Sequence, residues 1–159
     1  MPDKRRVILL RHAQSTANSM RLLTGRNDPQ LTRLGIRQAK RASRVIKKRF
    51  PSIDILYASP MKRCLATAGI IAKKTGAPVI PDELLMETDF GEWEGASREE
   101  LIQKPEWNKY AKDPFHFHFP GGESPQDVKK RILQFRDNLL KRTDWENVAV
   151  ISHYTPIVF

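Results

Sequence analysis

Short apolar runs alternate with longer amphipathic stretches along this chain. Residues 7–10 are four consecutive apolar residues, which is typical of a short strand that is buried on both faces of a parallel sheet. Residues 53–57, 79–80 and 148–151 form three further short apolar segments. The spacing of these runs leaves room for a helix after most strands, so the pattern predicts an α/β protein.

Three helices are predicted between or beside these strands. The first runs from an N-cap at Thr32 to Phe50, and the second spans 61–75 with Gly76 as a left-handed terminator. The third spans 124–142, with serine as the cap and proline as the first helical residue. The inner stripe of the first helix is predicted to hold Ile36, Ala39, Ala42, Val45 and Ile46.

Residues 96–123 interrupt this regular alternation. Ser97 followed by Glu100 is a capping-box signature for a short helix, and residues 113–123 are rich in turn formers. We therefore expect a flap on the substrate side of one domain that spans residues 1–159. The complete order of elements predicts a three-layer α/β/α sandwich with a mostly parallel central sheet.

Composition places few restrictions on function but excludes some classes. At 159 residues the chain is long enough for one domain with a proper core, and no apolar run approaches the length of a transmembrane helix. The apolar run before Arg11 is too short for a secretory signal. A single cysteine, Cys64, cannot form an internal disulfide and suits a reducing compartment, so we expect a cytoplasmic protein.

The net charge of +10 is concentrated at the start of the chain. Residues 1–50 hold 14 basic and 2 acidic residues, whereas the remainder holds 14 basic and 16 acidic residues. A local positive field favours anionic partners such as phosphorylated metabolites, phosphopeptides, nucleic acid or acidic membranes. Most of these cations lie on the solvated sides of the predicted 32–50 helix and no nucleic-acid motif accompanies them, so we expect neither nucleic acid nor a membrane as partner.

Groups suited to phosphoryl chemistry follow each predicted strand. They are, in chain order, Arg11 and His12, then Ser59 with Arg63, then Glu87, and finally His153. Because the carboxyl ends of parallel strands share one edge of the sheet, these side chains are predicted to converge there. A guanidinium binds phosphate oxygens with a planar fork, and a neutral imidazole can attack phosphorus.

Five blocks of this sequence together resemble the histidine phosphatase superfamily, which includes the cofactor-dependent phosphoglycerate mutases. The blocks are residues 11–18, 24–39, 58–68, 87–95, and 121–124 with 150–153. The resemblance covers nearly the whole chain and implies a phosphoglycerate mutase-like fold.

The resemblance also implies roles for individual residues. His12 would be the nucleophile that becomes phosphohistidine, and Glu87 would be the general acid and then the general base. The transferring phosphoryl group would be held by Arg11, Arg63 and His153, helped by Asn18, Ser15, Thr24 and Gly25. Two arginines and a histidine can neutralise the phosphoryl oxygens without a metal, so we expect no metal and no other cofactor.

The sequence departs from the family pattern in three places. Ala13 and Tyr154 stand where glycine usually follows the two histidines. Ala13 would be strained if its position required a positive φ. The chain also stops six residues after His153, where family members continue with another helix and strand. We therefore expect a truncated or shortened form that lacks these two elements.

The length of the excursion favours hydrolysis over phosphoryl transfer between substrates. Only 26 residues separate Gly95 from Gly122, whereas the mutases carry a longer insertion that grips the substrate carboxylate. We therefore predict a phosphohydrolase that acts on a small phosphorylated metabolite or a phosphoprotein. The alternatives are a mutase-type phosphotransferase, or a catalytically impaired module that binds phosphate or nucleic acid. His116 and His118 could face one side of a strand as metal ligands, but no third ligand lies nearby in sequence, so we expect no metal there.

Overall fold

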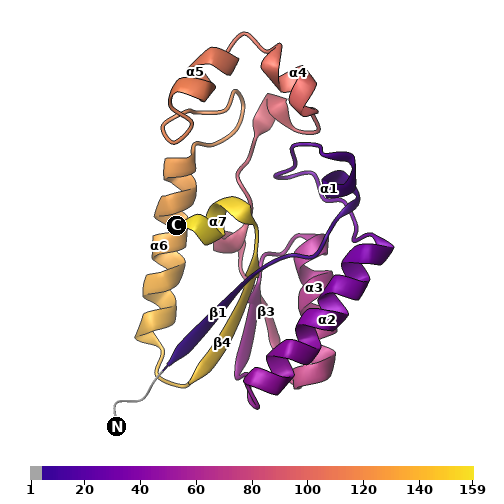
Figure 1. The fold of residues 1–159 in the computed structure, drawn as a ribbon. Helices are drawn as coiled ribbons and strands as arrows, with labels where there is room; N and C mark the ends of the chain where they lie inside the picture. The colour runs from indigo at the N-terminus through magenta and orange to yellow at the C-terminus, as the bar shows by residue number, and fades with distance from the viewer. Residues whose placement is uncertain (1–4) are drawn as a thin grey trace.

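The computed structural model describes residues 5–159 and contains one parallel sheet at its centre (Figure 1). Within these residues the strands are β1 (Arg6–Arg11), β2 (Ile55–Ala58), β3 (Val79–Pro81) and β4 (Asn147–Ser152). They lie in the order β1-β4-β2-β3, and every neighbouring pair is parallel. The predicted parallel sheet is therefore confirmed.

Helices cover both faces of this sheet. The α-helices are α1 (Thr16–Met20), α2 (Arg33–Arg49), α3 (Lys62–Thr75), α4 (Arg98–Ile102), α5 (Trp107–Lys112), α6 (Pro125–Lys141) and α7 (Tyr154–Val158). Two short 3₁₀ helices, η1 (Glu83–Leu85) and η2 (Gly91–Trp93), follow β3. Helices α2 and α3 pack on one side and α6 on the other, which gives the three predicted layers (Figure 1).

The predicted helix boundaries follow from local hydrogen bonding. The Thr32 hydroxyl accepts the Gly35 N–H at 3.0 Å and caps α2. Gly76 ends α3 with a φ of 84°, a conformation that favours glycine. Ser124 and Asp127 form a capping box at the start of α6, directly before the proline that the sequence places at the first helical position.

The side chains of the central strands alternate between the two helical layers. On β2, Leu56 and Ala58 face the core beneath α2 and α3, whereas Ile55 and Tyr57 face α6. The Tyr57 ring meets Phe135 of α6 at a centroid distance of 5.3 Å. Because both faces of β2 and β4 are covered, every residue in these strands is buried.

The prediction that residues 7–10 are buried on both faces is wrong. Val7 is 45% exposed and Leu9 is 55% exposed, whereas Ile8 and Leu10 contact the core under α2 and α3. The physical reason is position, because β1 is an edge strand of the described sheet and α6 leaves its second face open.

The predicted inner stripe of α2 is also partly wrong. Ile36 and Val45 are exposed, while Gly35 and Ser43 are buried together with Ala39 and Ile46. A Cβ atom at Gly35 would lie 2.1 Å from the Gln14 carbonyl oxygen, so the helix approaches the loop after β1 through a residue without a side chain.

Residues 96–123 form a layer above the sheet that is held together by aromatic packing. Trp93 is only 1% exposed, and four rings of the segment have their centroids within 6.4 Å of it. These rings belong to Trp107, Tyr110, Phe117 and Phe119. We call residues 96–123 the flap.

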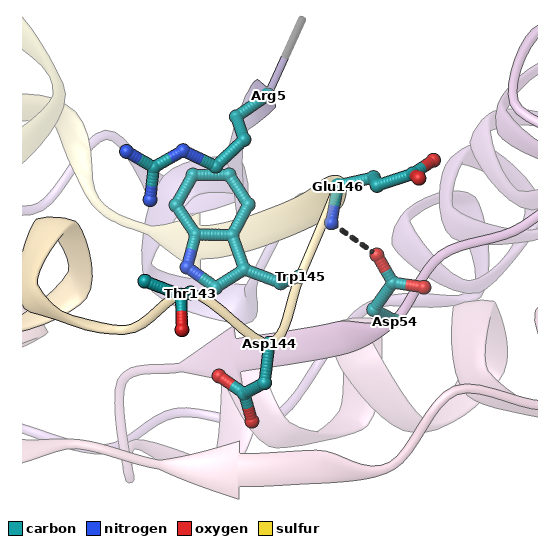
Figure 2. A pocket seen from close by; sticks show the side chains of 6 residues that line it. All are labelled: Arg5, Asp54, Thr143, Asp144, Trp145 and Glu146. Carbon is teal, nitrogen blue, oxygen red and sulfur yellow. Dashed lines mark hydrogen bonds between the residues drawn. The ribbon is translucent and has the colours of Figure 1, made fainter. Parts of the chain in front are cut away.

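At the amino-terminal edge of the sheet, side chains bind the backbone and pack on one another around a cavity. This cavity of about 480 Å³ is bordered by Arg5, Asp54 and residues 143–146. Figure 2 shows the side chains that line it. The Asp54 carboxylate accepts the Glu146 and Asn147 N–H groups at 2.7 and 2.8 Å, and the Arg5 guanidinium lies 4.9 Å from the Trp145 ring centre. No helix of the described part of the chain has the length and apolarity required to cross a membrane.

Candidate active site

The carboxyl ends of the strands lie level with one another at one edge of the sheet. Arg11 pairs with Ser152 across β1 and β4, and Ala58 of β2 is in register with both Ile151 and Pro81. The residues that follow each strand are therefore delivered to the same edge.

His12 is nearly buried at the end of β1, and its ring orientation is fixed. It is 8% exposed, and its Nδ1 lies 2.8 Å from the Ala13 carbonyl oxygen. A carbonyl can only accept, so Nδ1 carries the hydrogen and Nε2 keeps a free lone pair. The pKa of His12 is lowered to about 4, mainly by burial. The positive charges of Arg63 and Arg11 also lower this pKa, whereas the Ala13 hydrogen bond raises it. The imidazole is consequently neutral near pH 7, as a nucleophile requires.

Ala13 adopts its backbone conformation without strain. Arg21 is the only non-glycine residue with a positive φ among residues 5–159, so the position of Ala13 does not require glycine. The Ala13 N–H donates to the Thr67 hydroxyl at 3.1 Å, which links the turn after β1 to α3.

Arg63 lies in the first turn of α3 and is 1% exposed. Its guanidinium donates to the carbonyl oxygens of Gly25 and Asn27, both at 2.8 Å, and lies 3.8 Å from the Asp28 carboxylate. Burial lowers the pKa of Arg63 from its ordinary value, but an arginine remains cationic at neutral pH. A fixed cation therefore stands at the edge of the site.

His153 connects Arg63 to His12. Its Nδ1 accepts from the Arg63 guanidinium at 3.1 Å, so Nε2 carries the hydrogen and donates to the Ser59 hydroxyl at 2.8 Å. The His153 and His12 rings meet edge to face at 5.2 Å. Burial, followed by the charge of Arg63, lowers the pKa of this fully buried histidine.

Glu87 is tied by its carboxylate to the start of α7. One oxygen accepts the Thr88 N–H at 2.9 Å, and the other accepts the Tyr154 and Thr155 N–H groups at 3.1 and 3.5 Å. Glu87 is 6% exposed and thus lies beside the residues that directly follow His153.

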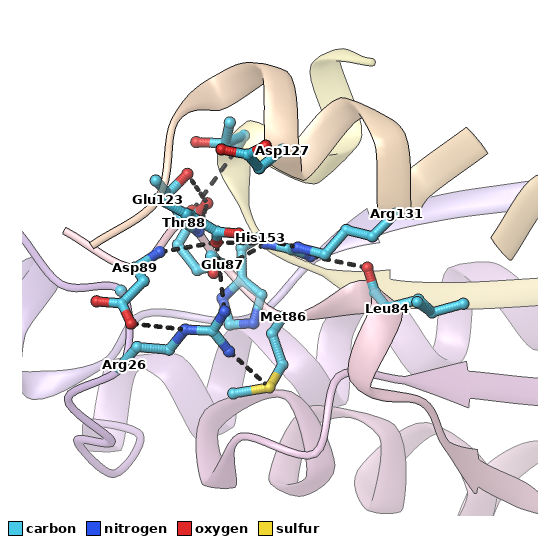
Figure 3. Close-up of polar contacts among 12 residues, drawn as sticks. Arg26, Leu84, Met86, Glu87, Thr88, Asp89, Glu123, Asp127, Arg131 and His153 are labelled. Atoms are coloured by element: carbon cyan, nitrogen blue, oxygen red, sulfur yellow. Dashed lines mark hydrogen bonds and ion pairs between the residues drawn. The ribbon is translucent and has the colours of Figure 1, made fainter. Parts of the chain in front are cut away.

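Ion pairs among Arg131, Glu123 and Arg26 support the backbone of the Glu87 segment (Figure 3). Arg131 of α6 donates to the carbonyl oxygens of Leu84 and Glu87 at 2.8 and 3.1 Å. The same guanidinium pairs with the Glu123 carboxylate at 2.9 Å, and that carboxylate also accepts from Arg26 at 3.3 Å. The sequence pattern does not single out Glu123 or Arg131, although Glu123 lies in one of the matching blocks.

The Glu94 carboxylate supports the loop of residues 25–27, which binds Arg63 through its carbonyl oxygens. Its carboxylate accepts the N–H groups of Gly25, Arg26 and Asn27 at 2.7–3.2 Å. A Cβ atom at Gly25 would lie 1.8 Å from the Thr88 carbonyl oxygen, so only glycine allows this loop to lie against the Glu87 segment. No spacing rule in the sequence distinguishes Glu94 from an ordinary loop acid.

The remaining predicted site residues lie in the surrounding loops. Arg11 is exposed, with its guanidinium 5.8 Å from the Tyr154 ring centre, so it lies at the mouth of the site. Ser15 and Asn18 form the capping box of α1, and the Thr24 hydroxyl donates to the Leu22 carbonyl at 3.3 Å. Contacts of these three residues with a phosphate stay a prediction.

His116 and His118, the two flap histidines discussed above as possible metal ligands, have no unusual surroundings. His116 lies 3.0 Å from the Asp113 carboxylate, and both side chains are mostly exposed. Within residues 5–159 no group of three or more His, Cys, Asp or Glu side chains is arranged to hold a metal ion.

Comparison with known proteins identifies the family. Residues 7–159 match the Histidine phosphatase superfamily (branch 1). This chain belongs to that superfamily. Phosphoserine phosphatase 1 of Hydrogenobacter thermophilus is 34% identical over 154 residues, which cover 96% of this chain and 72% of that protein.

A solved structure and a longer relative extend the comparison. The crystal structure of a putative alpha-ribazole-5'-P phosphatase from Escherichia coli superposes with a TM-score of 0.89 at 27% identity, covering 96% of this chain and 75% of that chain. A bifunctional protein of Mycobacterium tuberculosis is 35% identical over 153 residues. The chain described here spans only 42% of the length of that longer protein.

Proposed function

We propose that this histidine phosphatase superfamily member is a phosphohydrolase that cleaves phosphate monoesters through a phosphohistidine on His12. The observation that carries the proposal is the state of His12: a buried, neutral imidazole with a free Nε2, adjacent to the Arg63–His153 pair. Relatives named as phosphatases support hydrolysis as the reaction.

The first half of the proposed reaction transfers the phosphoryl group to the protein. Nε2 of His12 attacks phosphorus as the bond from phosphorus to the ester oxygen breaks, while Glu87 gives its proton to the departing oxygen. Arg63 and Arg11 neutralise the charge on the phosphoryl oxygens, and His153 positions the Arg63 guanidinium by accepting its hydrogen bond. Ser15, Asn18, Thr24 and Gly25 complete the cradle. The products are an alcohol, a phosphohistidine and a Glu87 carboxylate.

The second half releases phosphate and restores the starting state. The Glu87 carboxylate takes a proton from a water molecule as its oxygen attacks phosphorus, and the bond between phosphorus and Nε2 breaks. Inorganic phosphate leaves, Glu87 is protonated again, and His12 is neutral. Protons pass only between Glu87, the departing ester oxygen and the attacking water, so the proposed cycle requires no cofactor.

A mutase-type phosphotransferase is the second candidate, since a 2,3-bisphosphoglycerate-dependent phosphoglycerate mutase of Methylobacterium is 34% identical over 162 residues. The short flap favours hydrolysis, because 26 residues between Gly95 and Gly122 leave little chain to enclose a second substrate group. We further propose a small phosphorylated metabolite as substrate and a cytoplasmic location, which suits the free, buried thiol of Cys64.

A single-turnover experiment separates these possibilities. The protein in excess over a radiolabelled monoester, with glycerol present as an acceptor, should release the label as inorganic phosphate. Label found on the acceptor alcohol, with little free phosphate, would replace the hydrolase by the phosphotransferase. His12→Ala should reduce turnover by about a thousandfold or more, because no other group replaces the nucleophile. Equal turnover in His12→Ala would remove the proposed mechanism.

A further inference from the structure

A cavity of about 510 Å³ lies between the flap and α7. On the flap side it is lined by the half-buried rings of Trp107, Tyr110 and Phe115, and on the other side by Tyr154 and Phe159. Aromatic side chains with an open face can still bury apolar surface from a bound molecule. A cavity of this volume is within the usual range for small-molecule sites and exceeds the volume of one six-membered ring.

Three residues that donate hydrogen bonds to the proposed acid–base group line the cavity. Thr88, Tyr154 and Thr155 all line it, and their backbone N–H groups are the donors that hold the Glu87 carboxylate. In the reaction proposed above, Glu87 protonates the departing ester oxygen. The carbon skeleton attached to that oxygen would therefore extend into this cavity.

The charge of the lining disfavours a leaving group that carries an ammonium. Among the described residues that line the cavity, Arg98 is the only charged one, and its side chain is exposed. An ammonium group placed there would lose water and find no carboxylate partner, which is unfavourable. An aryl or other apolar group would instead gain free energy by leaving water.

From this juxtaposition we propose that the preferred substrates are phosphate monoesters of alcohols with an apolar, ring-containing skeleton. The inference rests on the phosphohydrolase function proposed above and specifies its substrate class. It separates this chain from an enzyme specialised for a zwitterionic ester such as phosphoserine.

The test compares two esters of primary alcohols, so that the intrinsic reactivity of the leaving oxygen is similar. The kcat/KM for 2-phenylethyl phosphate should exceed that for O-phosphoserine by about tenfold or more, as expected for burial of one ring. Phe115→Ala and, as a second variant, Trp107→Leu should reduce this ratio to about threefold or less. The control is His116→Ala, which changes the neighbouring exposed ring outside the cavity and should leave the ratio unchanged. Circular dichroism of each variant verifies its folding.

A binding measurement tests the proposed substrate class without requiring catalysis. By calorimetry, 2-phenylethylphosphonate should bind the wild-type protein about tenfold more tightly than 2-aminoethylphosphonate. Equal binding of the two phosphonates, or an equal kcat/KM for the two esters, would overturn the substrate class even if phosphatase activity is present. Absence of hydrolysis with the binding preference intact would overturn the phosphohydrolase and leave an apolar anion-binding cavity.

Discussion

The strand ends and the flap are held together by two different kinds of contact. At the strand ends, His12, Arg63 and Glu87 are all less than a tenth exposed, and main-chain carbonyl or N–H groups hold each of them in place. In the flap, the packing of rings around Trp93 joins the short helices. We infer from this contrast that backbone contacts fix the proposed catalytic groups, whereas the flap is held by side-chain packing that can vary without moving those groups.

The largest expected effect comes from the fixed cation at the strand ends. Arg63→Lys keeps the charge but loses the planar fork that reaches Gly25, Asn27 and His153 together. We expect kcat/KM to fall by about two to three orders of magnitude, as for loss of a preorganised donor to the transition state. The loss should be the same for aryl and polar esters, because the flap is unchanged. A loss confined to one ester class would show that the two regions are not independent.

The next effect concerns the support behind Glu87. Arg131→Met breaks a pair in which Arg131 is 14% and Glu123 17% exposed, and it leaves two carbonyl groups without their donor. We expect the free energy of unfolding to fall by about 2–4 kcal/mol in urea denaturation. The matched control on the same helix is Arg136→Met, whose pair with Asp137 is more than half exposed and should cost less than about 1 kcal/mol. Equal losses in the two variants would remove Arg131 as a support of the site.

A smaller effect appears in the pH dependence of stability. The pKa of His12 is lowered to about 4 in the folded state, whereas the unfolded imidazole titrates near its ordinary value of 6.5. Between these values the unfolded chain binds a proton that the folded chain does not, so stability falls as the pH decreases through this window. His12→Gln should therefore lower the pH dependence of the unfolding free energy between pH 6 and 5 by about 1.2 kcal/mol per pH unit, slightly less than one full proton. An unchanged slope would mean that His12 is not held neutral by the fold.

Much of the fold and site could be predicted because the signals are local or topological. Helix caps such as Thr32 and the Ser124–Asp127 box depend on residues three apart, and the convergence of His12 with His153 follows from the shared edge of a parallel sheet. The apolar pattern alone cannot show that β1 is an edge strand, so it predicts a buried Leu9, whereas Leu9 is 55% exposed.

The supporting residues could not be predicted because they act across long sequence separations. Glu94 accepts hydrogen bonds from a loop 69 residues earlier, and Arg131 reaches Glu87 44 residues away. Each of these two positions is occupied by an ordinary charged residue in sequence, and only the packed structure shows which backbone groups it satisfies. The same holds for Gly35, which is buried because it meets the Gln14 backbone.

The most direct test of the account is to trap the covalent intermediate. The protein is mixed with a radiolabelled monoester, quenched within one turnover and digested, and the labelled peptide is identified. We predict a label that is stable in alkali, labile in acid, carried by the peptide containing His12, and absent from His12→Gln. A hydrolytically active protein that carries no label, or whose label lies on another residue, would contradict the central claim that His12 takes up phosphorus.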